Sequence, residues 1–87
     1  VIDKKQNIWI GTTNGLNYYQ RDKEVFTRFF TTTETNKSLS SNTINTLYLD
    51  GNNLWVGTPS GLDRVDTKTM TIERYAGTKW FSMVGVH

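Results

Sequence analysis

The chain repeats the stretch Asn7-Ile-Trp-Ile-Gly-Thr-Thr-Asn-Gly-Leu16 as Asn53-Leu-Trp-Val-Gly-Thr-Pro-Ser-Gly-Leu62. The two copies lie 46 positions apart. The same separation places Phe26-Thr-Arg-Phe29 on Ile72-Glu-Arg-Tyr75, so the correspondence extends well beyond the first match. A period of 20–50 residues is typical of proteins built from tandem structural repeats.

Each copy has the pattern of short strands separated by turns. Ile44-Asn-Thr-Leu-Tyr-Leu-Asp50 alternates, which predicts Leu47 and Leu49 on one face and Ile44 and Tyr48 on the other, with both faces buried. The Gly and Asn residues that follow Asp50 favour a tight turn. Further strands are expected at residues 16–19, 24–29, 54–58, 62–66 and 70–75.

This pattern predicts an all-β fold of β-propeller blades, with about two four-stranded antiparallel meanders of a larger ring. We expect a first blade at residues 1–30 with an incomplete inner strand, an inter-blade loop at 31–43 and a second blade at 44–75. Residues 76–87 are unassigned, although their composition is compatible with a further strand. Since rings have typically 4–8 blades, the chain is expected to be an excerpt of a larger ring or, less favoured, a protomer that joins other copies.

Several segments of the chain resemble the two-component regulator propeller repeat. They are Ser38-Leu-Ser-Ser-Asn-Thr-Ile44, Asp50-Gly51, Leu54-Trp-Val-Gly-Thr58, Gly61-Leu62 and Ile72-x-x-Tyr75. Repeats of this family occur in tandem in the periplasmic sensor regions of bacterial hybrid two-component histidine kinases. The resemblance therefore implies a periplasmic sensor module that responds to a saccharide-like signal, in a parent protein whose kinase domain lies outside this chain.

Composition excludes several other classes of function. The 87 residues contain no cysteine and a single histidine, so neither a disulfide framework nor a His/Cys zinc site is expected. The formal charge is +2 and the cations are scattered, which does not favour a nucleic-acid partner. No cofactor and no metal are expected.

Trp9 and Trp55 occupy the same position in the two copies. Each is followed two residues later by a glycine, Gly11 or Gly57. Aromatic rings can stack on sugars, but a repeated tryptophan in the middle of a strand is better explained by packing between blades, with the glycine leaving room for the neighbour. We therefore expect all four residues to be structural.

Two pairs of carboxylates, Asp63 with Asp66 and Asp22 with Glu24, resemble the pairs that glycosidases use. Neither pair recurs at the equivalent positions of the other copy, and each flanks an expected turn. Solvated turn residues are therefore the preferred interpretation. No catalytic motif is present, so enzyme activity is not expected.

The better candidate site is a polar, uncharged surface made by loops. In a four-stranded blade, the connection from one blade to the next and the hairpin between the second and third strands emerge at the same end. This places Ser41, Asn42 and Thr43 with Asn14 and Ser60, whose side chains suit sugar hydroxyls and also suit ordinary turns.

These expectations combine into a non-catalytic sensor propeller with a possible oligosaccharide ligand. The partners expected are other blades of the same or another chain, in a homo-oligomer or a fragment of a dimeric sensor. Two alternatives stay open: a fragment of a propeller-fold polysaccharide lyase or hydrolase, and a purely structural interaction scaffold.

Overall fold

The computed structural model describes residues 1–33 and 38–75, and every strand in it is antiparallel to its neighbours. The first sheet has the order β1 (Ile8–Thr12), β2 (Gly15–Gln20), β3 (Val25–Phe29). The second has the order β4 (Thr46–Asp50), β5 (Asn53–Thr58), β6 (Gly61–Asp66), β7 (Thr71–Tyr75). The predicted all-β fold of two propeller blades is confirmed. The strand proposed for residues 76–87 falls outside the described part of the chain.

The internal repeat is reproduced in the backbone. Gly15 and Gly61 both have positive φ, as do Glu24 and Met70, and each pair is 46 positions apart. Glu24 and Met70 each stand immediately before the last strand of their sheet. Two different sequences therefore make the same turn, because the geometry of the meander requires a left-handed residue there.

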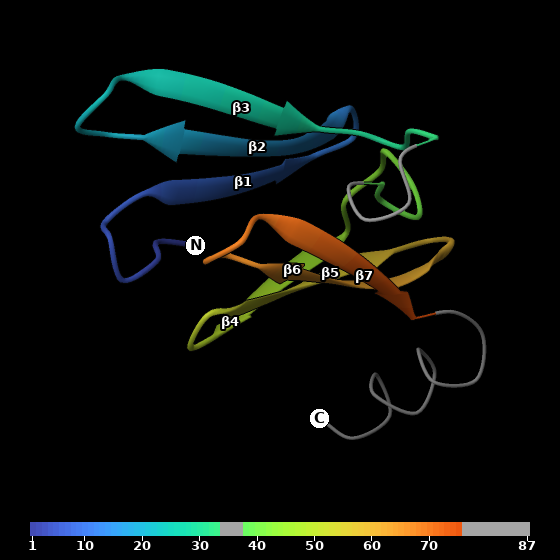
Figure 1. Ribbon diagram of the computed structural model, residues 1–87. Helices are drawn as coiled ribbons and strands as arrows, with labels where there is room; N and C mark the ends of the chain where they lie inside the picture. The colour runs from blue at the N-terminus through green and yellow to red at the C-terminus, as the bar shows by residue number, and fades with distance from the viewer. Residues whose placement is uncertain (34–37, 76–87) are drawn as a thin grey trace.

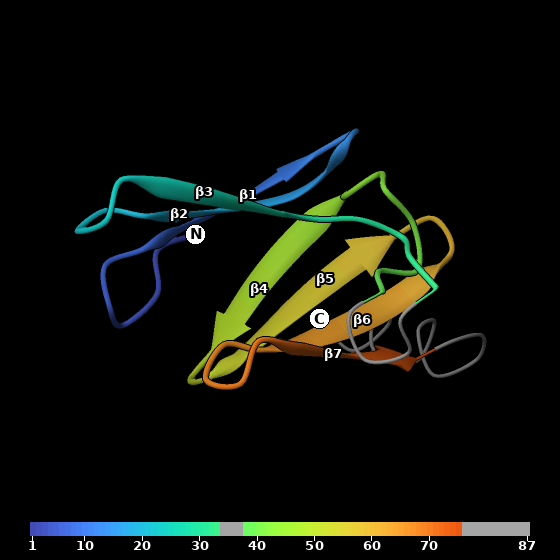
Figure 2. The ribbon, with the colours of Figure 1, turned by 45° about the horizontal axis from the view of Figure 1, so that its top comes forward.

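The two sheets lie one above the other, joined by the crossover from β3 to β4 (Figure 1). The hairpin turns β1–β2 and β5–β6 lie at the same end as the crossover, whereas the turns β2–β3, β4–β5 and β6–β7 lie at the opposite end (Figures 1 and 2). We call these the crossover end and the far end. Before β1, the first sheet has only an isolated bridge between Ile2 and Ile8 in the position of an inner strand.

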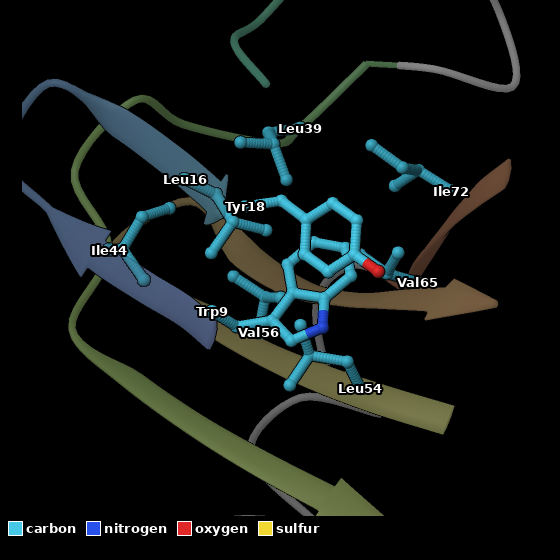
Figure 3. Close-up of a cluster of buried hydrophobic side chains, with 9 residues drawn as sticks. All are labelled: Trp9, Leu16, Tyr18, Leu39, Ile44, Leu54, Val56, Val65 and Ile72. Atoms are coloured by element: carbon cyan, nitrogen blue, oxygen red, sulfur yellow. The ribbon is translucent and has the colours of Figure 1, made fainter. Parts of the chain in front are cut away.

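The core lies between the two sheets. Trp9 is 1% exposed, and its ring stacks on Tyr18 with centroids 4.1 Å apart. Figure 3 shows these rings among side chains of the second sheet, including Leu54, Val56 and Val65. Truncating a buried aromatic of this kind typically costs about 3–5 kcal/mol, so this contact is a principal source of stability.

The prediction that Ile44 and Leu47 lie on opposite faces of one strand is wrong. β4 begins at Thr46, so Ile44 belongs to the crossover and its direction is not set by strand alternation. Ile44 is buried in the cluster between the sheets, and Leu47 and Leu49 pack against that same cluster. Tyr48 is 65% exposed, so burial on both faces of this strand is also wrong for the described residues.

Candidate functional site

The two hairpins at the crossover end are built in the same way. The Thr12 hydroxyl donates to the Gly15 carbonyl at 2.7 Å, and the Thr58 hydroxyl donates to the Gly61 carbonyl at 2.8 Å. Each threonine Oγ1 also accepts the amide of the second turn residue, Asn14 or Ser60. These paired bonds fix the turn backbone, so the side chains of Asn14 and Ser60 are held outward at the tips of rigid hairpins.

The crossover is attached to the first hairpin by backbone hydrogen bonds. The Gly15 amide donates to the Asn42 carbonyl at 2.6 Å, and the Ile44 amide donates to the Thr12 carbonyl at 2.8 Å. Asn14 and Asn42 are therefore neighbours, although 28 positions separate them in the sequence. Within residues 1–33 and 38–75, no hydrogen bond joins Ser60 to Asn14 or Asn42, although the hairpin of Ser60 lies at the same end (Figure 2).

Asn42 also holds the crossover through its side chain. Its Oδ1 accepts the amide of Thr31 at 2.8 Å, and the nearby Ser41 hydroxyl accepts the amide of Thr43 at 3.1 Å. Both residues are half-buried. These bonds give Asn42 and Ser41 a structural role in shaping the loop. Asn14 and Ser60, which are exposed, are thus the more accessible members of the polar loop surface, defined as Asn14, Ser41, Asn42, Thr43 and Ser60.

Asp63 is not a solvated turn residue, and that interpretation is wrong. It lies within β6, is 0% exposed, and accepts both the amide of Ser40 at 2.8 Å and its hydroxyl at 2.6 Å. Burial raises the pKa of the Asp63 carboxyl, while the bonds from Ser40 oppose that rise. The carboxylate anchors the crossover to the second blade. The equivalent residue of the first copy, 46 positions earlier, is Asn17. This difference between the two copies is the only feature of the sequence that indicates the role of Asp63.

Asp66, the other member of that pair, does belong to a turn. Its Oδ1 accepts the amides of Lys68 and Thr69, and these bonds lower the pKa of its carboxyl. The two carboxylates therefore have different surroundings and different tasks, and neither is arranged as an acid and base facing a common substrate position.

A second polar network joins the segment before β1 to the strands of the first blade. Asp3 is buried and accepts the Trp9 indole N–H at 3.1 Å, and the Asn7 amide group donates to the Tyr18 hydroxyl at 2.8 Å. Burial raises the pKa of Tyr18. The network orients Trp9 for packing and leaves its N–H satisfied. Sequence reasoning missed Asp3 and Asn7, because each meets its aromatic partner only once the turn at residues 4–6 has formed.

Trp55 has a different environment from Trp9. It is half-buried and tilts against Tyr75 with ring centroids 5.7 Å apart. Strand pairing places it on one face with Tyr48 and Arg64. No other sheet covers that face among the described residues, so Trp55 and Gly57 do not lie between two sheets there.

A small hollow of about 40 Å³ lies at the far end. It is lined by residues of both blades: Asp3, Lys4, Lys5, Gly51, Asn52, Thr67 and Lys68. Its three lysines give it a cationic character that the polar loop surface lacks. An anionic ligand would therefore favour the far end, and a neutral polyhydroxyl ligand would favour the crossover end.

Within residues 1–33 and 38–75, no three His, Cys, Asp or Glu side chains gather to form a metal-binding group. In the same part of the chain, the structure has no helix with the length and apolar character to cross a membrane.

Residues 38–60 match the family model described as two component regulator propeller. The match covers the described end of the crossover, β4, β5 and the β5–β6 turn, which are the segments that hold Ser40, Asn42 and Trp55. This segment of the chain is thus similar to the repeat of this propeller family. No curated protein matches the chain.

Proposed function

We propose that this chain, with its two component regulator propeller repeat at residues 38–60, is a non-catalytic part of the sensor propeller of a two-component regulator. In this proposal the module works in the periplasm and binds a neutral, carbohydrate-like ligand through the polar loop surface. The blades supply a rigid base for the loops and perform no chemistry.

One observation carries the proposal. The 2.6 Å bond from the Gly15 amide to the Asn42 carbonyl joins the hairpin of the first blade to the crossover that leads into the second. This bond brings Asn14 and Asn42 close together at one end of the sheets, although 28 positions separate them in the sequence. Rigid scaffolds that present loops in this way are a common arrangement for binding sites.

The chemistry of the surface favours a neutral polyhydroxyl ligand. Its five side chains are amides and hydroxyls, which both donate and accept hydrogen bonds, as sugar hydroxyls do. Two of its members, Asn42 and Ser41, already hold the loop. We therefore assign direct ligand contact to Asn14 and Ser60 first.

Titration of the ¹⁵N-labelled chain with two probes tests this assignment. With maltohexaose, a neutral oligosaccharide, we expect chemical-shift changes at residues 13–14, 41–43 and 60. Asn14→Ala is expected to weaken that binding by about tenfold, the loss typical of one or two polar contacts. The matched control is Asn52→Ala, the same substitution at an exposed turn of the far end, and it leaves binding unchanged.

A trigalacturonate, an anionic probe, distinguishes the other location. Changes confined to residues 4–5, 51–52 and 67–68 with either probe would move the site to the lysine-lined hollow and contradict the proposal. Absence of binding by both probes at millimolar concentration would also contradict it, and would favour a purely structural scaffold.

A further inference from the structure

The lysine-lined hollow at the far end lies between three turns. The turn at residues 4–6 belongs to the first blade, and the β4–β5 and β6–β7 turns belong to the second. Both ribbon views place these turns side by side (Figures 1 and 2). All three contribute to the lining of the hollow. It is therefore a feature of the junction between consecutive blades.

Hydrogen bonds hold the walls of the hollow in place. In the first blade, the Gln6 amide donates to the Asp3 carbonyl and the Asp3 amide donates to the Asn7 carbonyl, both at 2.9 Å. In the second blade, the Thr67 amide and hydroxyl both donate to the Asn52 carbonyl, at 2.9 and 3.0 Å. These bonds tie the β6–β7 turn to the β4–β5 turn. A ligand that enters the hollow does not have to order its walls, which favours binding.

The hollow carries an excess of positive charge. Lys4, Lys5 and Lys68 line it, and Asp3 is the acidic residue in its lining. Within residues 1–33 and 38–75, none of the three lysine ammonium groups forms an ion pair with a carboxylate. Three cations around one small space repel each other. An anion in that space would relieve the repulsion.

The Asp3 carboxylate already has donors from its own blade. Its Oδ1 accepts the amides of Lys5 and Asn7 at 2.9 and 3.0 Å, and its Oδ2 accepts the Trp9 indole N–H at 3.1 Å. Asp3 is buried, and these three N–H groups stabilise its charge. The carboxylate therefore holds the turn to Trp9 and does not act as the counter-ion of the lysines.

We propose that the lysine-lined hollow binds one compact oxyanion of the phosphate class. Its volume of about 40 Å³ is room for roughly three water molecules, which suits a phosphate group and is smaller than a sugar ring. Lysine ammonium groups bind phosphate as point charges, and a phosphate dianion meets three of them here. The site is separate from the polar loop surface, so it does not rest on the proposed function.

A phosphate in the hollow would join the two blades at the far end. Lys4 and Lys5 come from the first blade and Lys68 comes from the second, so an anion that contacts both sides bridges the junction. At the crossover end, the bond from Gly15 to Asn42 already makes such a link. Because a ligand that binds only the folded state stabilises it, phosphate is expected to raise the melting temperature of the chain.

Titration of the ¹⁵N-labelled chain with inorganic phosphate tests the proposal. At about pH 8, where phosphate is mainly a dianion, and at constant ionic strength, we expect saturable chemical-shift changes at residues 3–5, 51–52 and 67–68. Residues 13–14, 41–43 and 60 are expected to stay unchanged. Acetate, a planar monoanion, is expected to bind at least tenfold more weakly. Changes that do not saturate, or equal binding of acetate, would overturn the proposal.

Charge-matched variants separate the hollow from the general charge of the chain. Lys5→Gln combined with Lys68→Gln removes one lysine of each blade and is expected to weaken phosphate binding by about tenfold. The control combines Arg21→Gln with Lys23→Gln, which removes two exposed cations from the β2–β3 turn at the same end. It is expected to leave the affinity unchanged. An equal loss in both double variants would overturn the proposal.

Thermal melts give a second readout. Phosphate also stabilises proteins through its exclusion from their surface, and this general effect is expected to be the same in wild type and in both double variants. The additional rise in melting temperature is expected in wild type and in the Arg21→Gln, Lys23→Gln variant, and is expected to be absent from the Lys5→Gln, Lys68→Gln variant. The same rise in all three proteins would contradict binding in the hollow.

Two further titrations identify the source of the phosphate group and keep the two proposals apart. Glycerol 3-phosphate that binds as tightly as inorganic phosphate assigns the hollow to the phosphoryl group of a larger molecule, and weaker binding assigns it to the free ion; either result supports the shared chemistry. Maltohexaose is expected to bind the Lys5→Gln, Lys68→Gln variant as it binds wild type. Loss of phosphate binding with retained maltohexaose binding would thus leave the polar loop surface intact as the saccharide site.

Discussion

The buried carboxylate of Asp63 ties the crossover to the middle of the second blade. Both of its oxygens accept hydrogen bonds from Ser40, and the backbone amide of that residue has no strand partner. A fully buried donor that loses its acceptor costs about 1–3 kcal/mol, and the half-buried Ser40 is expected to lie at the lower end of that range. This single residue therefore positions the loop that leads to Asn42 and the polar loop surface.

The pH dependence of stability is expected to show the burial of Asp63. Its pKa is raised above the ordinary value of 3.8, so the folded state holds the proton more tightly than the unfolded chain. Protonation at Asp63 then stabilises the fold as pH falls toward about 4. We expect the free energy of unfolding of wild type, minus that of Asp63→Asn, to increase between pH 7 and pH 4 in urea titrations.

Asp66→Asn provides the control of opposite sign. The pKa of Asp66 is lowered by the amides of Lys68 and Thr69, so its ionised form stabilises the turn and that contribution is lost as pH falls. We therefore expect the free energy of unfolding of wild type, minus that of Asp66→Asn, to decrease as the pH falls from 7 to 4. If the free energy of unfolding of wild type, minus that of Asp63→Asn, stays constant or decreases as the pH falls from 7 to 4, that would contradict the burial of Asp63.

At the scale of elements, close approach of β1 to the crossover depends on Gly11. A Cβ added there would lie 2.5 Å from Cγ2 and 3.1 Å from Cβ of Ile44. Ile44 is branched at Cβ and is held by its amide bond to Thr12, so it cannot simply rotate away. The glycine lets the first residues of the crossover pack directly on the strand.

We expect Gly11→Ala to lower the free energy of unfolding by about 1–3 kcal/mol, the usual cost of overpacking. In an Ile44→Ala background the same substitution is expected to cost much less, because the clashing methyl is gone. Gly51→Ala is the control, since a Cβ there meets nothing within 4 Å and its cost comes from φ of +61° alone. Equal costs of Gly11→Ala in both backgrounds would show that Ile44 does not pack on Gly11.

The strands were largely predictable from the chain, because alternation and turn residues are local signals. Glycine favours turns, and Gly15, Gly51 and Gly61 do have positive φ in the structure. The repeat also predicts the position of each strand a second time. The sequence pattern predicts that β4 begins at Ile44, two residues before its observed start at Thr46. Apolar character alone does not distinguish a residue of a strand from a residue of the crossover when both are buried in the same core.

The candidate site was predictable in part. Repeat topology puts the hairpin and the crossover at one end, and the bond between Gly15 and Asn42 shows them in contact. The roles of Asp63, Asp3 and Asn7 were not predictable, because each depends on a partner brought close only by folding. The residues around an aspartate beside a turn do not show whether its carboxylate is exposed to solvent or buried in the fold.

At the scale of the whole molecule, the two sheets share one core. Trp9 of the first sheet and Leu54, Val56 and Val65 of the second belong to a single buried cluster. The proposed function depends on this interface, because the loops of the crossover end are held by both sheets. It therefore depends on the packing of Trp9 across the two repeats.

Nuclear Overhauser effects in a methyl-labelled sample report directly on the packing of Trp9 against the second sheet. We predict cross-peaks from the Trp9 indole protons to methyl groups of Leu54 and Val56, which lie more than 40 positions away in the sequence. Peaks between Trp9 and Tyr18, within one sheet, serve as the internal standard. If the Trp9–Tyr18 peaks are present and no peak joins Trp9 to the second repeat, the two sheets fold separately, which would contradict the shared core.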